Sequence, residues 1–65
     1  MLINILTITD GNEITRVPVS CEGYALKYKK ALIDLGFQVS LTRAEMPQLD
    51  AAETNRGRQY IQDVK

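Results

Sequence analysis

Apolar and polar residues follow a strand-like pattern at the start of the chain. Residues 2–9 (LINILTIT) are rich in isoleucine and threonine, the β-branched types that suit strands, and apolar side chains fall on both parities. A strand that is apolar on both faces is typical of the centre of a sheet. Asp10, Gly11 and Asn12 form a turn signal, and residues 13–19 predict a second strand. Pro18 cannot donate a ladder hydrogen bond, so we expect this second strand at an edge.

The pattern then changes to the spacing of a helix. Residues 21–35 carry apolar side chains at i, i+3, i+4 and i+7, namely Cys21, Tyr24, Ala25, Tyr28, Ala31, Leu32 and Leu35. Ser20 is expected as the N-cap, and Glu22 suits the positive end of the helix dipole. Gly36 stands where a left-handed residue would end the helix. Phe37 would then pack on Leu32 in a Schellman close.

The third strand is predicted over residues 37–45, where apolar and polar residues alternate. A second helix is predicted over residues 51–64. Asp50 and Glu53 have the spacing of a capping box before it, and Gly57 weakens it by up to ~1 kcal/mol relative to alanine.

These elements predict an α+β fold made as one domain over residues 1–65. A right-handed crossover and a central first strand favour a three-stranded antiparallel sheet of order 2-1-3, with ββαβ topology. One helix packs on the sheet. The C-terminal helix covers part of the open sheet face, packs on a second chain, or frays.

The length of the chain limits its core. A 65-residue domain buries about 60% of its unfolded surface, and its core rarely supplies more than ~3–5 kcal/mol. Small domains often add disulfides, a metal or a second subunit. A single cysteine and the absence of histidine argue against a disulfide within the chain and against a structural zinc site. We therefore expect no cofactor or metal, and a homodimer is one possible assembly.

Charge and hydropathy argue against two classes of partner, nucleic acids and membranes. Eight acidic and eight basic residues cancel, whereas a general nucleic-acid binder carries a basic excess. We interpret the basic side chains of the two helices as solvated charges. The alternative is a small nucleic-acid-binding regulator that uses Lys27, Lys29, Lys30, Arg56 and Arg58. The apolar run at the start is too short to span a bilayer and lacks a basic leader. We expect a cytoplasmic protein without a membrane partner.

Catalytic chemistry finds little support in the sequence. Histidine, the commonest general base, is absent. Cys21 is the one candidate nucleophile, and its helical position predicts a buried, inert side chain. Asp10 and Glu13 flank a turn and are read as turn residues, because the other ligands of a calcium loop are missing. We expect a protein that is not an enzyme.

Two aliphatic residues of the first helix stand apart from its apolar face. Leu26 and Ile33 are seven positions apart, so they align as a stripe over 90° from the middle of that face. Two aligned exposed side chains are a modest sign of a contact surface. We predict a partner-binding site of Leu26 and Ile33 with Lys29, Lys30 and Glu22 as its rim. The alternative is that the second helix, or a broad wrap of the chain, covers the stripe.

In size, in its lack of catalytic residues and in its compact ββαβ plan, the chain resembles the small inhibitor proteins of phages and mobile elements, of the anti-CRISPR type. The resemblance covers the architecture of the whole chain and carries over no individual site residues. It implies a protein that docks on a bacterial defence complex, such as a CRISPR effector subunit, and blocks nucleic-acid binding or recruitment of a partner. A small subunit of a larger assembly is a further alternative.

Overall fold

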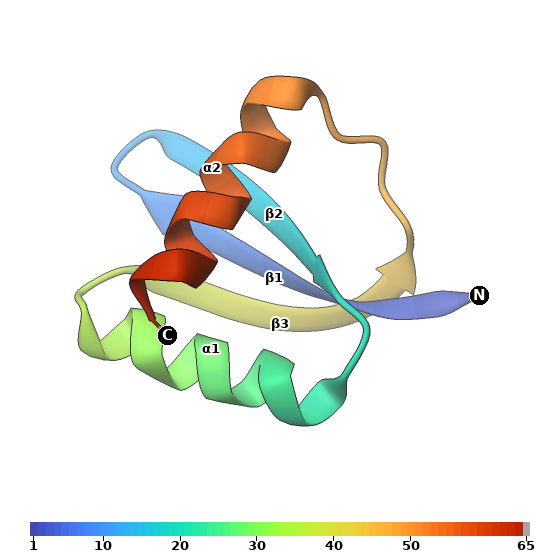
Figure 1. Ribbon diagram of the computed structural model, residues 1–65, viewed down its shortest axis with the longest axis horizontal. Coiled ribbons are helices and arrows are strands. Elements are labelled where there is room, and N and C mark those ends of the chain that lie inside the picture. The colour runs from blue at the N-terminus through green and yellow to red at the C-terminus, as the bar shows by residue number, and fades with distance from the viewer. Residues whose placement is uncertain (65) are drawn as a thin grey trace.

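The computed structural model describes residues 1–64 and has two helices packed on one sheet (Figure 1). Its elements are β1 (Leu2–Asp10), β2 (Glu13–Val19), α1 (Glu22–Asp34), β3 (Gln38–Glu45) and α2 (Ala51–Asp63). The strands are antiparallel and lie in the order β2-β1-β3. The predicted α+β class, the strand order and the element bounds, to within one residue at each end, agree with the structure.

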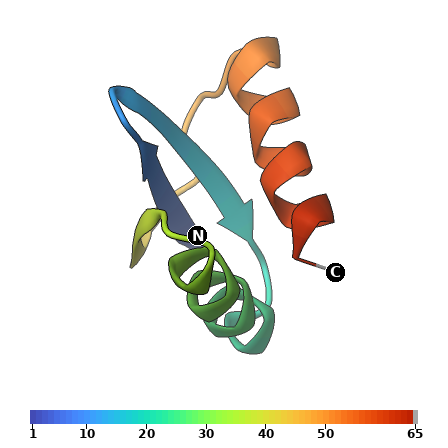
Figure 2. The same cartoon turned by 90° about the vertical axis from the view of Figure 1, so that its left-hand side faces the viewer.

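The strand register divides the sheet into two faces. On one face Leu6 of β1 lies between Val17 of β2 and Leu41 of β3. Leu6, Ile8, Val17 and Leu32 form the buried core on this face. Both helices lie on the same side of the sheet (Figure 2), because Leu32 comes from α1 and the apolar residues of α2 pack against the same cluster.

The opposite face of the sheet is not covered by a helix. Ile5 lies at its centre, between Pro18 of β2 and Thr42 of β3, and is nevertheless buried. On the β3 side this face carries Gln38, Ser40 and Thr42. The prediction that β1 is apolar on both faces and central therefore agrees with the structure, since the two neighbouring strands shield its outer side.

The start of α1 differs from its predicted form. We expected Ser20 as the N-cap and Cys21 within the helix on the core face. Instead Cys21 is the N-cap, makes no side-chain capping hydrogen bond, and is exposed. Because the helix begins one residue later than expected, Cys21 stands before the first turn and does not reach the core.

The buried strip of α1 is also narrower than the helical count indicates. Ala25 and Leu32 are fully buried, whereas Tyr24 and Leu35 are 56% and 58% exposed. The prediction that both belong to the core face is wrong. Since α2 packs against β2, the flank of α1 that carries these residues is left largely in solvent.

The end of α1 has the predicted Schellman geometry. The Phe37 amide donates to the Leu32 carbonyl at 3.1 Å, and the Gly36 amide donates to the Ile33 carbonyl at 2.9 Å. Gly36 has a φ of 101°, a conformation that glycine adopts without a steric penalty. This close turns the chain back, so that Phe37 packs against the core as β3 begins.

Packing of α2 against β2 depends on a glycine. A Cβ atom at Gly57 would lie 3.0 Å from a methyl group of Val17, closer than ordinary van der Waals contact. Gly57 is buried, and its missing side chain allows the helix backbone to approach the strand. Helix propensity alone predicts that Gly57 weakens α2, and the close approach to Val17 is the packing reason for a glycine at this position.

Candidate functional site

The described residues contain no cluster suited to metal binding. No group of three or more histidine, cysteine, aspartate or glutamate side chains within residues 1–64 could hold an ion. Cys21 is an exposed thiol at the start of α1. The candidate sites are therefore surfaces: the two edges of the sheet, the groove beside α2 and the outer side of α1.

The edge of the sheet formed by β2 is closed by α2. Glu53 accepts a hydrogen bond from the Arg16 amide at 2.8 Å and two more from the Arg16 guanidinium at 3.1 and 3.0 Å. The guanidinium hydrogen bond is the main reason why the pKa of Glu53 is lowered below its ordinary value. We expected Asp50 and Glu53 to cap α2 reciprocally. Asp50 does cap the helix, accepting from the Glu53 amide at 2.7 Å, but the Glu53 side chain is turned to β2.

The basic side chain of Arg56 also serves the fold. It donates to the hydroxyl of Thr15 at 3.1 Å and lies 3.4 Å from a Glu13 carboxylate oxygen. Both partners belong to β2, so Arg56 fastens the middle of α2 to that strand. One of the five basic residues considered for a nucleic-acid surface therefore has hydrogen-bond and ion-pair partners within the fold.

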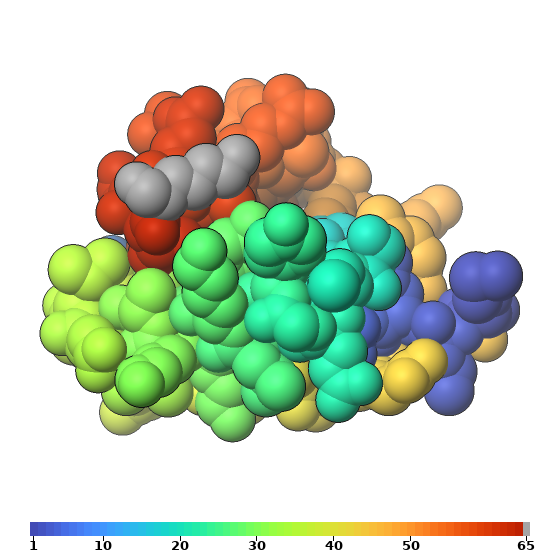
Figure 3. All heavy atoms as spheres, turned by 60° about the horizontal axis from the view of Figure 1, so that its bottom comes forward, coloured from blue at the N-terminus to red at the C-terminus, as the bar shows by residue number. Residues whose placement is uncertain are grey.

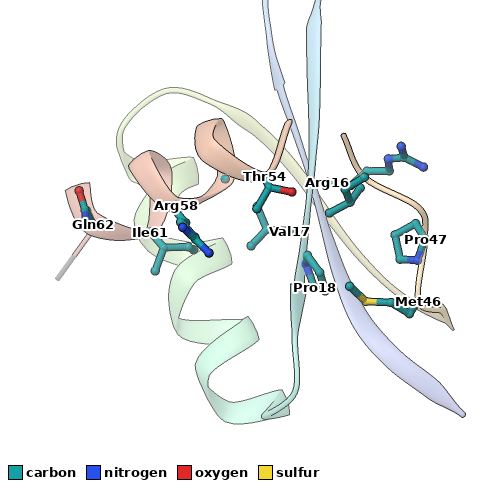
Figure 4. A pocket seen from close by; sticks show the side chains of 11 residues that line it. Arg16, Val17, Pro18, Met46, Pro47, Thr54, Arg58, Ile61 and Gln62 are labelled. Carbon is teal, nitrogen blue, oxygen red and sulfur yellow. The ribbon is translucent and has the colours of Figure 1, made fainter. Parts of the chain in front are cut away.

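A groove of about 660 Å³ lies between β2, the connection over residues 46–50 and α2 (Figure 4). Val17, Pro18 and Ile61 contribute apolar wall, while Arg58 stands on the α2 side. The described lining holds no carboxylate, histidine or cysteine. The groove therefore has a shape that could bury an apolar group but lacks the usual side chains for acid–base chemistry.

The predicted site residues lie on one side of α1, which we call the outer flank and define as Glu22, Leu26, Lys29, Lys30 and Ile33. Leu26 is 52% exposed and Ile33 is 46% exposed. The alternative in which α2 covers them does not apply, since α2 packs against β2. Figure 3 shows α1 as an uncovered ridge along this side of the molecule. Whether these residues bind a partner stays a prediction.

Helix handedness fixes where the outer flank points. Leu26 and Ile33 each follow a core residue, Ala25 and Leu32, by one position, which is a turn of about 100°. On the helix face of the sheet, α1 runs antiparallel to β3 (Figure 1). In a right-handed helix with this direction, the residue after each core position lies away from α2 and beside the unpaired edge of β3.

The predicted strand order 2-1-3 places β3 at an edge of the sheet, but the sequence analysis did not consider that edge as a binding surface. The Arg16 amide donates to Glu53, so the backbone amide and carbonyl of Arg16 point away from β1. Thr7 lies opposite Arg16 in β1, and its backbone amide and carbonyl must therefore point to β3. Thr7 pairs with Ser40, so the alternate residues of β3 point their amides and carbonyls outward: Val39, Leu41, Arg43 and Glu45. No described strand pairs with this edge. The signal was the strand order itself, because the alternation of residues 37–45 fits an edge strand and a paired strand equally well.

Comparison of the chain with protein-family models, with curated proteins and with solved structures finds no match. Neither α1 nor α2 has the length and apolar character that crossing a bilayer requires.

Proposed function

We propose that this chain is a non-enzymatic protein-binding module, an inhibitor that docks on a bacterial defence complex in the host cytoplasm. It blocks nucleic-acid binding or partner recruitment by that complex. The observation that carries the proposal is the exposed pair Leu26 and Ile33 on the outer flank of α1. The core of the fold is complete without these two side chains.

The energetics of burial support a binding role for this pair. Covering a leucine or isoleucine side chain on a partner contributes ~1.5–3 kcal/mol. That is enough to change the dissociation constant by about tenfold or more per residue. The charged neighbours Glu22, Lys29 and Lys30 form a rim that would steer encounter more than it adds affinity.

The test compares aspartate substitutions on α1. Leu26→Asp and Ile33→Asp should leave the melting temperature nearly unchanged, because both side chains already face solvent. Leu32→Asp should unfold the domain, because it buries a charge in the core. The functional readout is phage plaque formation on bacterial strains that carry defined CRISPR systems, with and without the protein.

A matched control comes from the opposite flank of α1. Tyr24 precedes Ala25 and Leu26 follows it, so the two lie about 200° apart, and their exposures are similar, at 56% and 52%. We expect Tyr24→Asp to inhibit as the parent does, whereas Leu26→Asp and Ile33→Asp should lose inhibition. Equal loss for all three variants, or no effect of the parent on any defence system, would contradict the proposal.

A further inference from the structure

We propose that the outer flank of α1 and the unpaired edge of β3 form one docking surface that takes an extended strand of the partner protein. The strand adds to β3 through backbone hydrogen bonds, and its side chains on the helix face lie beneath Leu26 and Ile33. The inference rests on the proposed function and specifies the chemistry of the partner segment.

The two edges of the sheet differ in how they are protected. At β2 the outward position 18 is a proline without an amide hydrogen, and the outward amide of Arg16 is bound by Glu53. Proline and covering elements are the usual devices that stop unwanted strand pairing. β3 has no proline, pairs with β1 in unbroken register, and makes no edge hydrogen bond to the rest of residues 1–64. One edge is closed while the other is open, as a strand-addition site requires.

The dimensions of the flank and of the edge agree. Leu26 and Ile33 are seven residues apart on α1, a separation of about 10 Å along the helix axis. The outward residues from Val39 to Arg43 span about 13 Å of β3. A strand of about five residues would therefore pair with this part of β3 and meet both aliphatic side chains.

The charges on this surface indicate which kind of partner strand would bind to it. Arg43 lies opposite Asn4 in the register, which places it at one end of the edge, on the helix face. Among the described ion pairs, none involves Lys29, Lys30 or Arg43. We infer a strand with apolar residues at alternate positions beside Val39 and Leu41, and a carboxylate beside Arg43.

A second copy of the chain fits this surface less well. In an antiparallel pair of β3 strands related by a two-fold axis, α1 would lie beside its own copy. Lys29 and Lys30 stand between Leu26 and Ile33 along the helix, so they would face the same lysines. Like charges in such a position oppose association.

The experiment uses two synthetic peptides and amide hydrogen exchange followed by nuclear magnetic resonance. One peptide carries glutamate, threonine, valine, threonine and valine in that order, and the other has lysine in place of glutamate. With the first peptide, the outward amides of Val39, Leu41 and Arg43 should become protected, whereas those of Ser40 and Thr42 are protected throughout. The lysine peptide should bind about tenfold more weakly, the change expected from loss of a charge-assisted pair.

Two variants of the protein test which side chains contact the peptide. Arg43→Glu should reverse the preference and bind the lysine peptide more tightly, and the double variant of Leu26→Asp and Ile33→Asp should weaken both peptides. Protection at β2, no protection at millimolar peptide, or equal binding of both peptides would overturn the inference. Protection of Val39 to Arg43 that rises with protein concentration, without peptide, would show that a second copy occupies the edge and would also overturn it. If Leu26→Asp abolishes inhibition while the β3 amides stay unprotected, the proposed function stands and strand addition fails.

Discussion

Replacement of Glu53 with alanine should detach α2 from the sheet. Glu53 lies in the first turn of α2 and is 8% exposed. Its carboxylate binds both the backbone amide and the guanidinium of Arg16, a residue 37 positions away in the sequence. These three hydrogen bonds tie the start of the helix to the edge strand.

The expected cost follows from the geometry. The alanine variant leaves the Arg16 amide without its acceptor, and a hydrogen bond to a charged group contributes ~1.5–3 kcal/mol. The Arg16 side chain is 43% exposed, so water replaces most of the lost guanidinium interaction and the ion pair itself adds little. We expect Glu53→Ala to lower the free energy of unfolding by about 2–3 kcal/mol. Glu53→Gln keeps an acceptor for the amide and should lose about half as much.

Urea denaturation followed by circular dichroism measures this cost. Glu45→Ala is the matched control, because Glu45 forms an ion pair of 2.9 Å with the amino terminus in which both partners are exposed. Such a surface pair is worth less than ~1 kcal/mol. A Glu53→Ala variant that loses no more stability than Glu45→Ala would refute the role assigned to Glu53.

Acid provides a second measurement on the same residue. The pKa of Glu53 is lowered in the folded state, so its stabilisation is present above the ordinary glutamate value of about 4.3 and is lost as the pH falls through the lower folded value. The difference in unfolding free energy between the parent and Glu53→Gln should therefore shrink below about pH 4. A difference that stays constant from pH 7 to pH 3 would show that the charge of Glu53 is not what stabilises the contact.

Two further predictions concern α2. Gly57→Leu should lower the free energy of unfolding by ~1–3 kcal/mol or more, because the larger side chain overpacks against Val17. Gly57→Ala should gain less than the ~1 kcal/mol that this change gains at an ordinary helical site. Thermal melts of both variants, with Arg58→Ala as the control, would test this, and a stabilised leucine variant would contradict it. The pKa of Tyr60 is raised, first by burial and then by the charges of Asp10 and Glu13, so stability that depends on its neutral phenol is lost as the pH rises above about 10. Tyr60→Phe should therefore lose less stability than the parent between pH 9 and pH 11, whereas the exposed control Tyr24→Phe should follow the parent; identical alkaline profiles for Tyr60→Phe and the parent would exclude this contribution.

Local backbone chemistry determined much of the fold from the sequence alone. Pro18 lacks an amide hydrogen, which places β2 at an edge whatever lies elsewhere. The left-handed conformation of Gly36 and the apolar Phe37 behind it determine where α1 ends and how the chain returns to β3. The apolar pattern of β1 on both parities made it the central strand, because a side chain on either face needs cover. Each inference depends on residues close together in the chain.

Which surfaces are closed depends on how distant elements pack together. Glu53 has the spacing of a local cap, yet its carboxylate finds Arg16 because folding brings α2 against β2. Tyr24 and Leu35 fit a helical apolar face, but the width of the buried strip depends on where α2 packs. The open edge of β3 is likewise a property of neighbours, since a strand with the same alternation would be closed if another strand lay beside it. The helical period predicts the direction of Leu26 and Ile33 relative to the core. The position of α2 leaves them uncovered beside β3. Their exposure could not be read from the sequence, because it depends on long-range packing that no local pattern encodes.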